Sequence, residues 1–159
     1  MVMPSSHAMN DTQPRPATAA DVAAITALVR DAYAKYIPRM GREPYPMTAD
    51  YAEAVRNQQV WVVEEGGQII AVLGLIPEAG HMMVENIAVA VGRQSQGLGR
   101  RLLAFAEAEA LRQGLPEMRL YTAQAMTENI GLYLRLGYVE TGRKTVVDIP
   151  RVYMSKRLT

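Results

Sequence analysis

The stretch Gln94-Ser95-Gln96-Gly97-Leu98-Gly99, "QSQGLG", is followed at once by the amphipathic segment "RRLLAFAEAEALRQG". The first backbone amides of a helix have no partner within the helix, and the helix dipole adds positive potential there, so helix N-termini attract anions. Glycine lets such a backbone approach a ligand closely. The stretch therefore predicts a phosphate site. A plain strand-to-helix turn is the commoner explanation of an isolated G-x-G pair, so the surrounding sequence has to decide.

The sequence on either side of this stretch reads as a buried strand and a long helix. The segment "GHMMVENIAVAV", residues 80–91, is mostly apolar, which is typical of a central strand. The helix is predicted to run to Gln113, because Gly114 suits a left-handed cap and Pro116 prevents continuation. The stretch thus joins a strand to a helix.

The rest of the chain divides into short periodic segments separated by Gly and Pro. Thr18 and Asp21 predict a helix start, and Pro38 is expected to end that helix. Thr48 is expected to cap a short second helix that runs to about residue 56. The remaining elements are predicted from apolar periodicity: strands at residues 60–64, 68–76 and 118–123, a helix from Thr127 to Leu136, and two final strands, 138–149 and 151–158, around Pro150.

This order of elements, α-α-β-β-β-α-β-α-β-β, predicts a single α/β domain with a mixed sheet. The 159 residues suffice for one domain with a proper core. Residues 1–14 are rich in Ser, Pro, Asn and Gln and read as a flexible N-terminal tail. The domain is therefore expected at residues 15–159.

The composition narrows the partners and the compartment. A net charge of +1 gives no indication of nucleic acid or of an anionic membrane surface as a partner, and neither is expected. Zero cysteines exclude disulfides, and with only two histidines no metal site is expected. No apolar run has the length of a membrane span or the pattern of a signal peptide, so a cytoplasmic protein is expected.

Two nucleotide-binding motifs do not match the glycines. A P-loop needs a Lys-Ser/Thr pair that is absent here, and the third glycine of a Rossmann fingerprint is replaced by Leu102. What remains is Gln-x-x-Gly-x-Gly after "NIAVAV" and before "ENIGLYLRLGY", and this combination resembles the GNAT superfamily of acetyl-CoA-dependent N-acetyltransferases. The resemblance covers roughly Arg15 to the C-terminus, and its specific parts are residues 85–103 and 127–138. It implies a GNAT fold: one α/β (α+β) domain with a mixed, mostly antiparallel central sheet flanked by helices.

The resemblance also implies an acetyl-CoA site without a metal. The diphosphate is expected on backbone amides of the turn, and the preceding strand is expected to bind the pantetheine arm as an extra strand would. Arg100 adds positive charge, whereas Arg101 reads equally well as a solvated residue. In many GNAT proteins an Asn seven residues before the catalytic Tyr contacts CoA, but that position is Met126 here, so Asn129 is the substitute candidate. The implied cofactor-binding residues are Ile87, Ala88, Val89, Gln94, Ser95, Gln96, Gly97, Leu98, Gly99, Arg100 and Asn129.

Two residues are candidates for the chemistry. Tyr133 occupies the position of the Tyr that GNAT enzymes commonly use near the thioester sulfur, and a phenol can donate a proton to a leaving thiolate. Glu85 lies in an apolar strand, where burial would raise its pKa toward that of a useful base, directly or through water. Strand alternation predicts that Glu85 shares a face with Ile87 and Val89, opposite Asn86. A packing Tyr and a structural carboxylate are the alternative explanations.

The acceptor side is less specific in the sequence. In this fold the first helices and their loop usually line the acceptor pocket, which suggests Tyr33, Tyr36 and Tyr45, with Arg39, Met40, Met47 and Tyr121 as further candidates. Aromatics with one Arg suggest an acceptor bearing a carboxylate or an aromatic group.

The predicted function is acetyl transfer from acetyl-CoA to a primary amine by direct attack in a ternary complex. The alternative is a non-catalytic acyl-CoA-binding regulatory module. Apolar alternation in "TVVDIPRVYMSKRL" would permit a homodimer, and a strand edge buried within the monomer explains it equally well.

Overall fold

The computed structural model describes residues 13–158, and in this part of the chain one seven-stranded sheet carries the fold. Its order is β1-β2-β3-β4-β5-β7-β6, and only the β4–β5 pair is parallel, which confirms the predicted mixed, mostly antiparallel sheet. The strands are β1 (Arg15–Pro16), β2 (Val60–Glu65), β3 (Gln68–Glu78), β4 (His81–Val89), β5 (Glu117–Ala123), β6 (Val139–Val146) and β7 (Ile149–Arg157). The short β1 was not predicted. Up to residue 12, the predicted tail lies outside the described residues.

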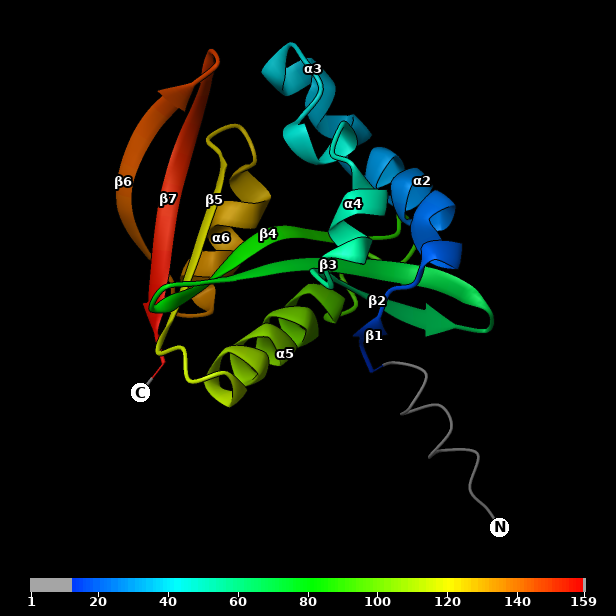
Figure 1. Cartoon of the computed structure of the whole chain (residues 1–159). Helices are drawn as coiled ribbons and strands as arrows, with labels where there is room; N and C mark the ends of the chain where they lie inside the picture. The colour runs from blue at the N-terminus through cyan, green and yellow to red at the C-terminus, as the bar shows by residue number, and fades with distance from the viewer. Residues whose placement is uncertain (1–12, 159) are drawn as a thin grey trace.

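Helices cover both faces of the sheet (Figure 1). On one face lie α5 (Leu98–Arg112) and α6 (Thr127–Arg135). The other face is covered by the N-terminal helical elements: η1 (Ala19–Asp21), α2 (Val22–Tyr33), η2 (Ala34–Tyr36), α3 (Ile37–Met40), η3 (Tyr45–Met47) and α4 (Tyr51–Arg56).

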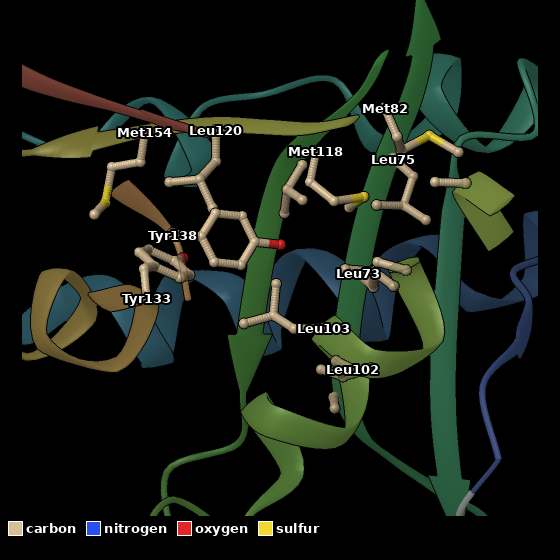
Figure 2. Packing of buried hydrophobic residues seen from close by; sticks show 14 of the residues in the cluster. Leu73, Leu75, Met82, Leu102, Leu103, Met118, Leu120, Tyr133, Tyr138 and Met154 are labelled. Atoms are coloured by element: carbon tan, nitrogen blue, oxygen red, sulfur yellow. The ribbon is translucent and has the colours of Figure 1, made fainter. Parts of the chain in front are cut away.

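The core under α5 fixes the centre of the sheet. Leu73 and Leu75 of β3 and Met118 of β5 pack against Leu102 and Leu103 of α5, and all five side chains are at most 1% exposed (Figure 2). Each such side chain contributes about 1.5–3 kcal/mol through burial. The central strands and α5 therefore form a rigid support for the loop between them.

The first helix does not end at Pro38, contrary to the prediction. Its helical hydrogen bonding tightens into η2 and resumes in α3, where Pro38 occupies one of the first two positions. A proline is tolerated there because the amide it lacks would have no partner within the helix. Gly41, with φ of 75°, ends α3 instead.

Two predicted boundaries were also misplaced. Asp50, not Thr48, caps α4, and its side chain accepts a hydrogen bond from the Glu53 amide at 3.1 Å. The turn between the last two strands is formed by Val147 and Asp148, which both have positive φ, while Pro150 lies within β7. Proline is compatible with this place near the start of the strand.

The sheet opens between its two middle strands. β4 and β5 pair only at Met82–Met118, Met83–Arg119 and Val84–Leu120. Beyond these pairs β5 continues along β7 as far as Ala123, and β4 continues along β3 as far as Val89. Figure 1 shows the two halves of the sheet diverging, with α3 facing the tip of the β6–β7 hairpin across the gap. The second half of β4 thus has no strand neighbour on its β5 side.

Candidate active site

A β-bulge lies at Glu85, in the middle of β4. Gly74 pairs with Asn86 and Leu75 with Val84, so Glu85 is an extra residue on β4. Glu85 and Asn86 both line a cavity against η3 and α4, whereas Ile87 and Val89 pack toward the α5 core. The predicted shared face of Glu85, Ile87 and Val89 is therefore wrong, because the bulge breaks the alternation at Glu85.

The "QSQGLG" stretch presents a run of free backbone donors. The amides of residues 95–100 donate no hydrogen bond to any other residue in the described range, and the first bond of the helix runs from the Arg101 amide to the Gly97 carbonyl at 3.1 Å. Gly97 has φ of 81° and Ser95 has φ of 68°, so the backbone curls before α5 begins. Such a curled run of amides at a helix N-terminus fits an anion such as a diphosphate.

Gly99 leaves open space above this turn. A Cβ atom at Gly99 would meet only Leu132 Cδ2, at an ordinary 3.5 Å. The protein's own packing therefore does not require glycine here. A closely approaching ligand would require it, because a side chain would keep the ligand away from the backbone.

A groove of about 420 Å³ runs from this turn along the open side of β4. Four basic side chains line it, namely Lys35, Arg93, Arg100 and Arg135, against the single acidic side chain of Glu128. This excess of positive charge suits a phosphate-bearing ligand. Of the predicted cofactor residues the groove is lined by Ile87, Ala88, Val89, Gln94, Ser95, Gly97, Leu98, Gly99, Arg100 and Asn129.

Two predicted residues lie apart from the groove lining. Gln96 is exposed, and its Oε1 atom accepts a long hydrogen bond of 3.4 Å from Arg93. The Arg101 side chain is also exposed and is not part of the groove lining. Only the backbone amide of Gln96 remains available to a ligand in the turn.

The open side of β4 offers alternate residues to a ligand. The Tyr33 hydroxyl lies 3.0 Å from the Ile87 carbonyl oxygen, and Gln94 Nε2 donates to the Val89 carbonyl oxygen at 3.2 Å. Because the N–H and C=O of a strand residue lie on the same side, the amides of Ile87 and Val89 also face the gap. Ala88, which pairs with Val72, directs its backbone toward β3 and offers the groove only its methyl group.

A second, narrower cavity of about 70 Å³ lies between β4, β5 and η3. Its lining contains one acidic and one basic side chain, Glu85 and Arg151. The remaining lining is aromatic, aliphatic or neutral polar and includes Tyr45, Asn86, Tyr121 and Met126. This second space, the acceptor cavity, has room for a small chemical group rather than a bulky one.

Tyr133 stands where the groove and the acceptor cavity meet. Four residues line both spaces: Tyr33, Ile87, Asn129 and Tyr133. Tyr133 is 4% exposed and packs its ring against Tyr138 at 5.8 Å between centroids (Figure 2). Its hydroxyl makes no hydrogen bond to another described residue. Burial, with smaller contributions from Tyr138 and Tyr36, raises the pKa of Tyr133, so the phenol stays protonated and can donate.

Glu85 is partly buried beside this junction. Burial raises the pKa of its carboxyl, Glu78 raises it further, and Arg151 opposes the change. A carboxylate with a raised pKa is a stronger base than an ordinary surface Glu. The residue therefore has the electrostatic setting expected of a general base.

Tyr33 belongs to a buried hydrogen-bond chain. Its hydroxyl lies 3.0 Å from Asn86 Oδ1 as well as from the Ile87 carbonyl, and Asn86 Nδ2 donates to the Tyr51 hydroxyl at 2.9 Å. The Tyr51 hydroxyl donates in turn to the Pro46 carbonyl at 2.6 Å. This chain holds α2, β4 and η3 together, so Tyr33 has a positioning role beside its place in the lining.

The other predicted acceptor residues divide between the two spaces. Tyr45 is 51% exposed and lines the acceptor cavity, as do Met40 and Tyr121. Tyr36 lines the groove instead, and Met47 is buried in the core under α2. The structure thus brings Tyr45 and Tyr121, but not Tyr36, next to Glu85.

An ion pair joins the two sides of the gap. Arg39 of α3 makes a bidentate pair with Glu128 of α6, at 2.6 and 2.8 Å. Asn129, next in the chain, donates to the Met126 sulfur at 3.7 Å. Met126 stands at the position usually occupied by Asn and is 4% exposed in the acceptor cavity lining.

Sequence reasoning missed Asn86, Arg93, Arg135 and Arg151, all of which line one of these spaces. Asn86 carried one usable signal, since a polar amide in an apolar strand needs a partner. Nothing in the order of residues distinguished Arg151 from the other arginines of the last strands. Its place depends on how β7 pairs with β5, which the sequence alone does not specify.

Residues 13–158 contain no group of three or more His, Cys, Asp or Glu side chains arranged to hold a metal ion. Nor does this range include a helix of the length and apolarity needed to cross a bilayer. The cytoplasmic location and the oligomeric state stay predictions.

The chain is similar in sequence to known acetyltransferases. Residues 24–138 match the family model described as "Acetyltransferase (GNAT) family". A curated relative, "N-acetyltransferase family 8 member 3" of Rattus norvegicus, is 25% identical over 88 residues, which are 52% of this chain and 39% of the relative. The chain spans less than half the length of the curated relatives it matches.

Solved structures share the whole fold at low sequence identity. PaiA N-acetyltransferase from Thermoplasma acidophilum, determined in complex with coenzyme A, has a TM-score of 0.77 and 15% identity over 91% of this chain and 98% of its own. The ribosomal-protein-S18-alanine N-acetyltransferase of Escherichia coli has a TM-score of 0.74 and 20% identity over 92% and 94%. At these identities the similarity concerns the fold.

Proposed function

The chain belongs to the acetyltransferase (GNAT) family, and on that premise we propose that it transfers the acetyl group of acetyl-CoA to a primary amine. The transfer is direct and takes place in a ternary complex. One observation carries the proposal: Tyr133 and Ile87 line both the groove and the acceptor cavity, so two substrates bound in these spaces would meet at them.

The groove residues would hold the cosubstrate. The free amides of residues 95–100 and the four basic side chains of the groove favour its phosphates. The amide of Val89, facing the gap between β4 and β5, favours its extended amide-containing arm. Acetyl-CoA supplies an acetyl thioester at the junction.

Glu85 prepares the amine. An alkylammonium has a pKa of about 10 and is not a nucleophile until it loses a proton. Glu85 accepts that proton, directly or through a water molecule, and its raised pKa makes the transfer more favourable than it would be to a surface carboxylate. The nitrogen lone pair then attacks the acetyl carbonyl carbon.

Two donors complete the reaction. The Ile87 amide, at the junction and facing the gap, donates a hydrogen bond to the carbonyl oxygen as negative charge develops there. When the carbon–sulfur bond breaks, the Tyr133 hydroxyl donates its proton to the sulfur. The attacking nitrogen, which still carries one proton more than the neutral amide, releases it to solvent, and solvent returns a proton to the phenolate. The product amide leaves through the acceptor cavity.

The test is the release of CoA at fixed acetyl-CoA concentration with a panel of acceptors. The panel contains simple amines, amino acids, aminoglycosides, and peptides with a free N-terminus or a lysine. Turnover on one acceptor class supports the proposal and identifies that class. Stabilisation of the protein by acetyl-CoA without turnover on any acceptor would instead favour the non-catalytic acyl-CoA-binding module.

A further inference from the structure

Arg151 occupies a defined place in the acceptor cavity. It lies on β7 opposite Ala123 of β5, and its guanidinium carbon is 4.2 Å from the centroid of the Tyr121 ring. Its neighbours Val152 and Met154 are buried in the α5 core. By strand alternation Arg151 therefore faces the opposite side of the sheet, where it lines the acceptor cavity together with Glu85.

The Arg151 guanidinium packs on an aromatic ring but forms no ion pair with a described residue. Stacking on Tyr121 fixes the plane of the group and leaves its N–H edge free. Within residues 13–158 it has no carboxylate partner and no hydrogen-bond acceptor. The nearby arginines differ, because Arg39 pairs with Glu128 and Arg42 donates to the Val147 carbonyl at 2.7 Å.

The acceptor cavity thus has two poles of opposite charge. Glu85 is the acidic side chain of its lining and Arg151 the basic one. An amine attacking at the junction approaches as a cation and is drawn to Glu85. A guanidinium offers a fork of N–H donors that matches a carboxylate, and this match is strongest where water is restricted.

We infer that Arg151 binds a carboxylate carried by the amine acceptor, so that the preferred acceptors are amino-acid-like. This inference rests on the proposed function and names the substrate class for it. Because both poles lie in one narrow cavity, the amine and the carboxylate of the acceptor are separated by a few bonds. A free amino acid satisfies this chemistry, and so does the N-terminus of a peptide that begins with an acidic residue.

The experiment measures binding first, with CoA saturating and no acetyl group present. Alanine, methionine and phenylalanine are each compared by titration calorimetry with the corresponding amino acid amide, which lacks the carboxylate charge. Peptides beginning Asp-Ala and Asn-Ala form the second arm and distinguish the two sources of the carboxylate. We expect at least one carboxylate-bearing ligand to bind wild-type protein about tenfold more tightly than its amide counterpart.

Variants assign that preference to Arg151. In Arg151→Met the ratio between the two ligands should fall to within twofold, and in Arg151→Lys it should be intermediate. Comparing this ratio between the wild-type and variant proteins cancels the difference in amine pKa between an amino acid and its amide. Arg143→Met is the matched control, since Arg143 lies on the adjacent strand β6, is exposed, and pairs with Glu140 at 2.8 Å.

The outcomes separate this inference from the proposed function. Equal binding of the acids and their amide counterparts by wild-type protein, or a preference that persists in Arg151→Met, would overturn the role of Arg151. A preference that depends on Arg151 supports it, whether or not CoA release follows. Failure to release CoA with the ligand that binds best would count against the proposed function alone. If Arg151→Met does not fold, the wild-type ratio and Arg151→Lys still decide the question.

Discussion

The groove and the acceptor cavity are built in different ways, although they share four lining residues. Backbone donors of the groove come mainly from one continuous segment, residues 95–100, and from the adjoining end of β4. The polar groups of the acceptor cavity are side chains from distant parts of the chain, including Glu85 of β4, Tyr121 of β5, Tyr133 of α6 and Arg151 of β7.

This difference determines what each region tolerates. A site made of backbone amides depends on where glycine permits close approach, and most side chains there can change without loss of the donors. In a site made of side chains, a substitution leaves the backbone around the site in place but changes the chemical groups that the site offers. Substitutions should therefore separate cosubstrate binding from acetyl transfer.

The largest effect is expected for Tyr133→Phe, which tests the chemical side of the comparison. It removes the donor at the junction and leaves the ring that packs against Tyr138. Loss of a general acid lowers kcat by roughly 10²–10³-fold. The rate is measured as CoA release at saturating acetyl-CoA and acceptor.

Binding of acetyl-CoA by Tyr133→Phe provides the control. The dissociation constant should stay within about threefold of wild type, because the groove donors are intact. Tyr138→Phe is the matched variant, since the Tyr138 hydroxyl is buried without a hydrogen-bond partner among the described residues. A variant Tyr133→Phe with wild-type kcat would refute the assignment of Tyr133 as the acid.

The next effect in size is expected for Glu85→Gln, through its dependence on pH. As a base Glu85 works deprotonated, so kcat/KM should rise with pH through the pKa of this carboxyl, which burial raises above its usual range. In Glu85→Gln this rise of kcat/KM with pH, the acidic limb of the profile, should disappear. At near-neutral pH kcat/KM should fall by about 10²-fold. The measurement is a pH–rate profile of both proteins between pH 5 and 9.

An unchanged acidic limb in Glu85→Gln would show that another group governs it. Glu78→Gln serves as the comparison, because Glu78 raises the pKa of Glu85 through its charge. Removing that charge should move the limb to slightly lower pH while kcat changes little. The two variants together distinguish a base from a carboxylate that only stabilises the cavity.

The same division explains how much could be predicted from the sequence. The groove could be predicted because its donors are contiguous: a strand, a glycine turn and a helix follow one another within residues 81–112. The predicted order of the main elements was also right, since each carries its own periodicity and its own stop signals. Local information suffices for local structure.

The acceptor cavity could not be predicted in this way. The bulge that turns Glu85 toward it arises from the pairing of β4 with β3, and no residue in "HMMVENIAV" signals it. Arg39 was expected near the acceptor, but Glu128 of α6 holds it at the mouth of the gap. Arg151 takes the place expected for Arg39 because β7 pairs with β5 in a register that only the folded sheet fixes.

A smaller, purely binding effect is expected for Gly99→Ala, which tests the backbone side of the comparison. The added methyl group meets only Leu132 Cδ2 at 3.5 Å, so the thermal midpoint should hardly change. If a phosphate lies against the Gly99 amide, the methyl group should weaken acetyl-CoA binding about tenfold, the cost of roughly one poorly made hydrogen bond. Titration calorimetry with acetyl-CoA measures this directly.

Gly142→Ala is the matched control for that substitution. Gly142 lies in β6, which contributes no residue to the groove lining, and a Cβ atom there would meet nothing within 4 Å. Its acetyl-CoA affinity should equal that of wild type. Equal affinity in Gly99→Ala as well would mean that the turn does not approach the ligand closely, and the backbone interpretation of the groove would be lost.

The smallest effect is expected for the ion pair between Arg39 and Glu128, which joins the two sides of the gap. Exposed pairs contribute little, so Glu128→Gln should change acetyl-CoA affinity and kcat by less than about threefold.

Hydrogen bonds from Arg39, and then from the backbone at Glu128 itself, lower the pKa of Glu128 to about 2. A lowered folded-state pKa stabilises the protein above the ordinary carboxyl value of 4.5, and that contribution is lost as pH falls toward 2. The thermal midpoints of wild type and Glu128→Gln should therefore differ by a constant amount above about pH 5 and converge at acid pH. A large loss of kcat in this variant would instead mean that the pair closes the gap during turnover, and the two regions could then no longer be treated as independent.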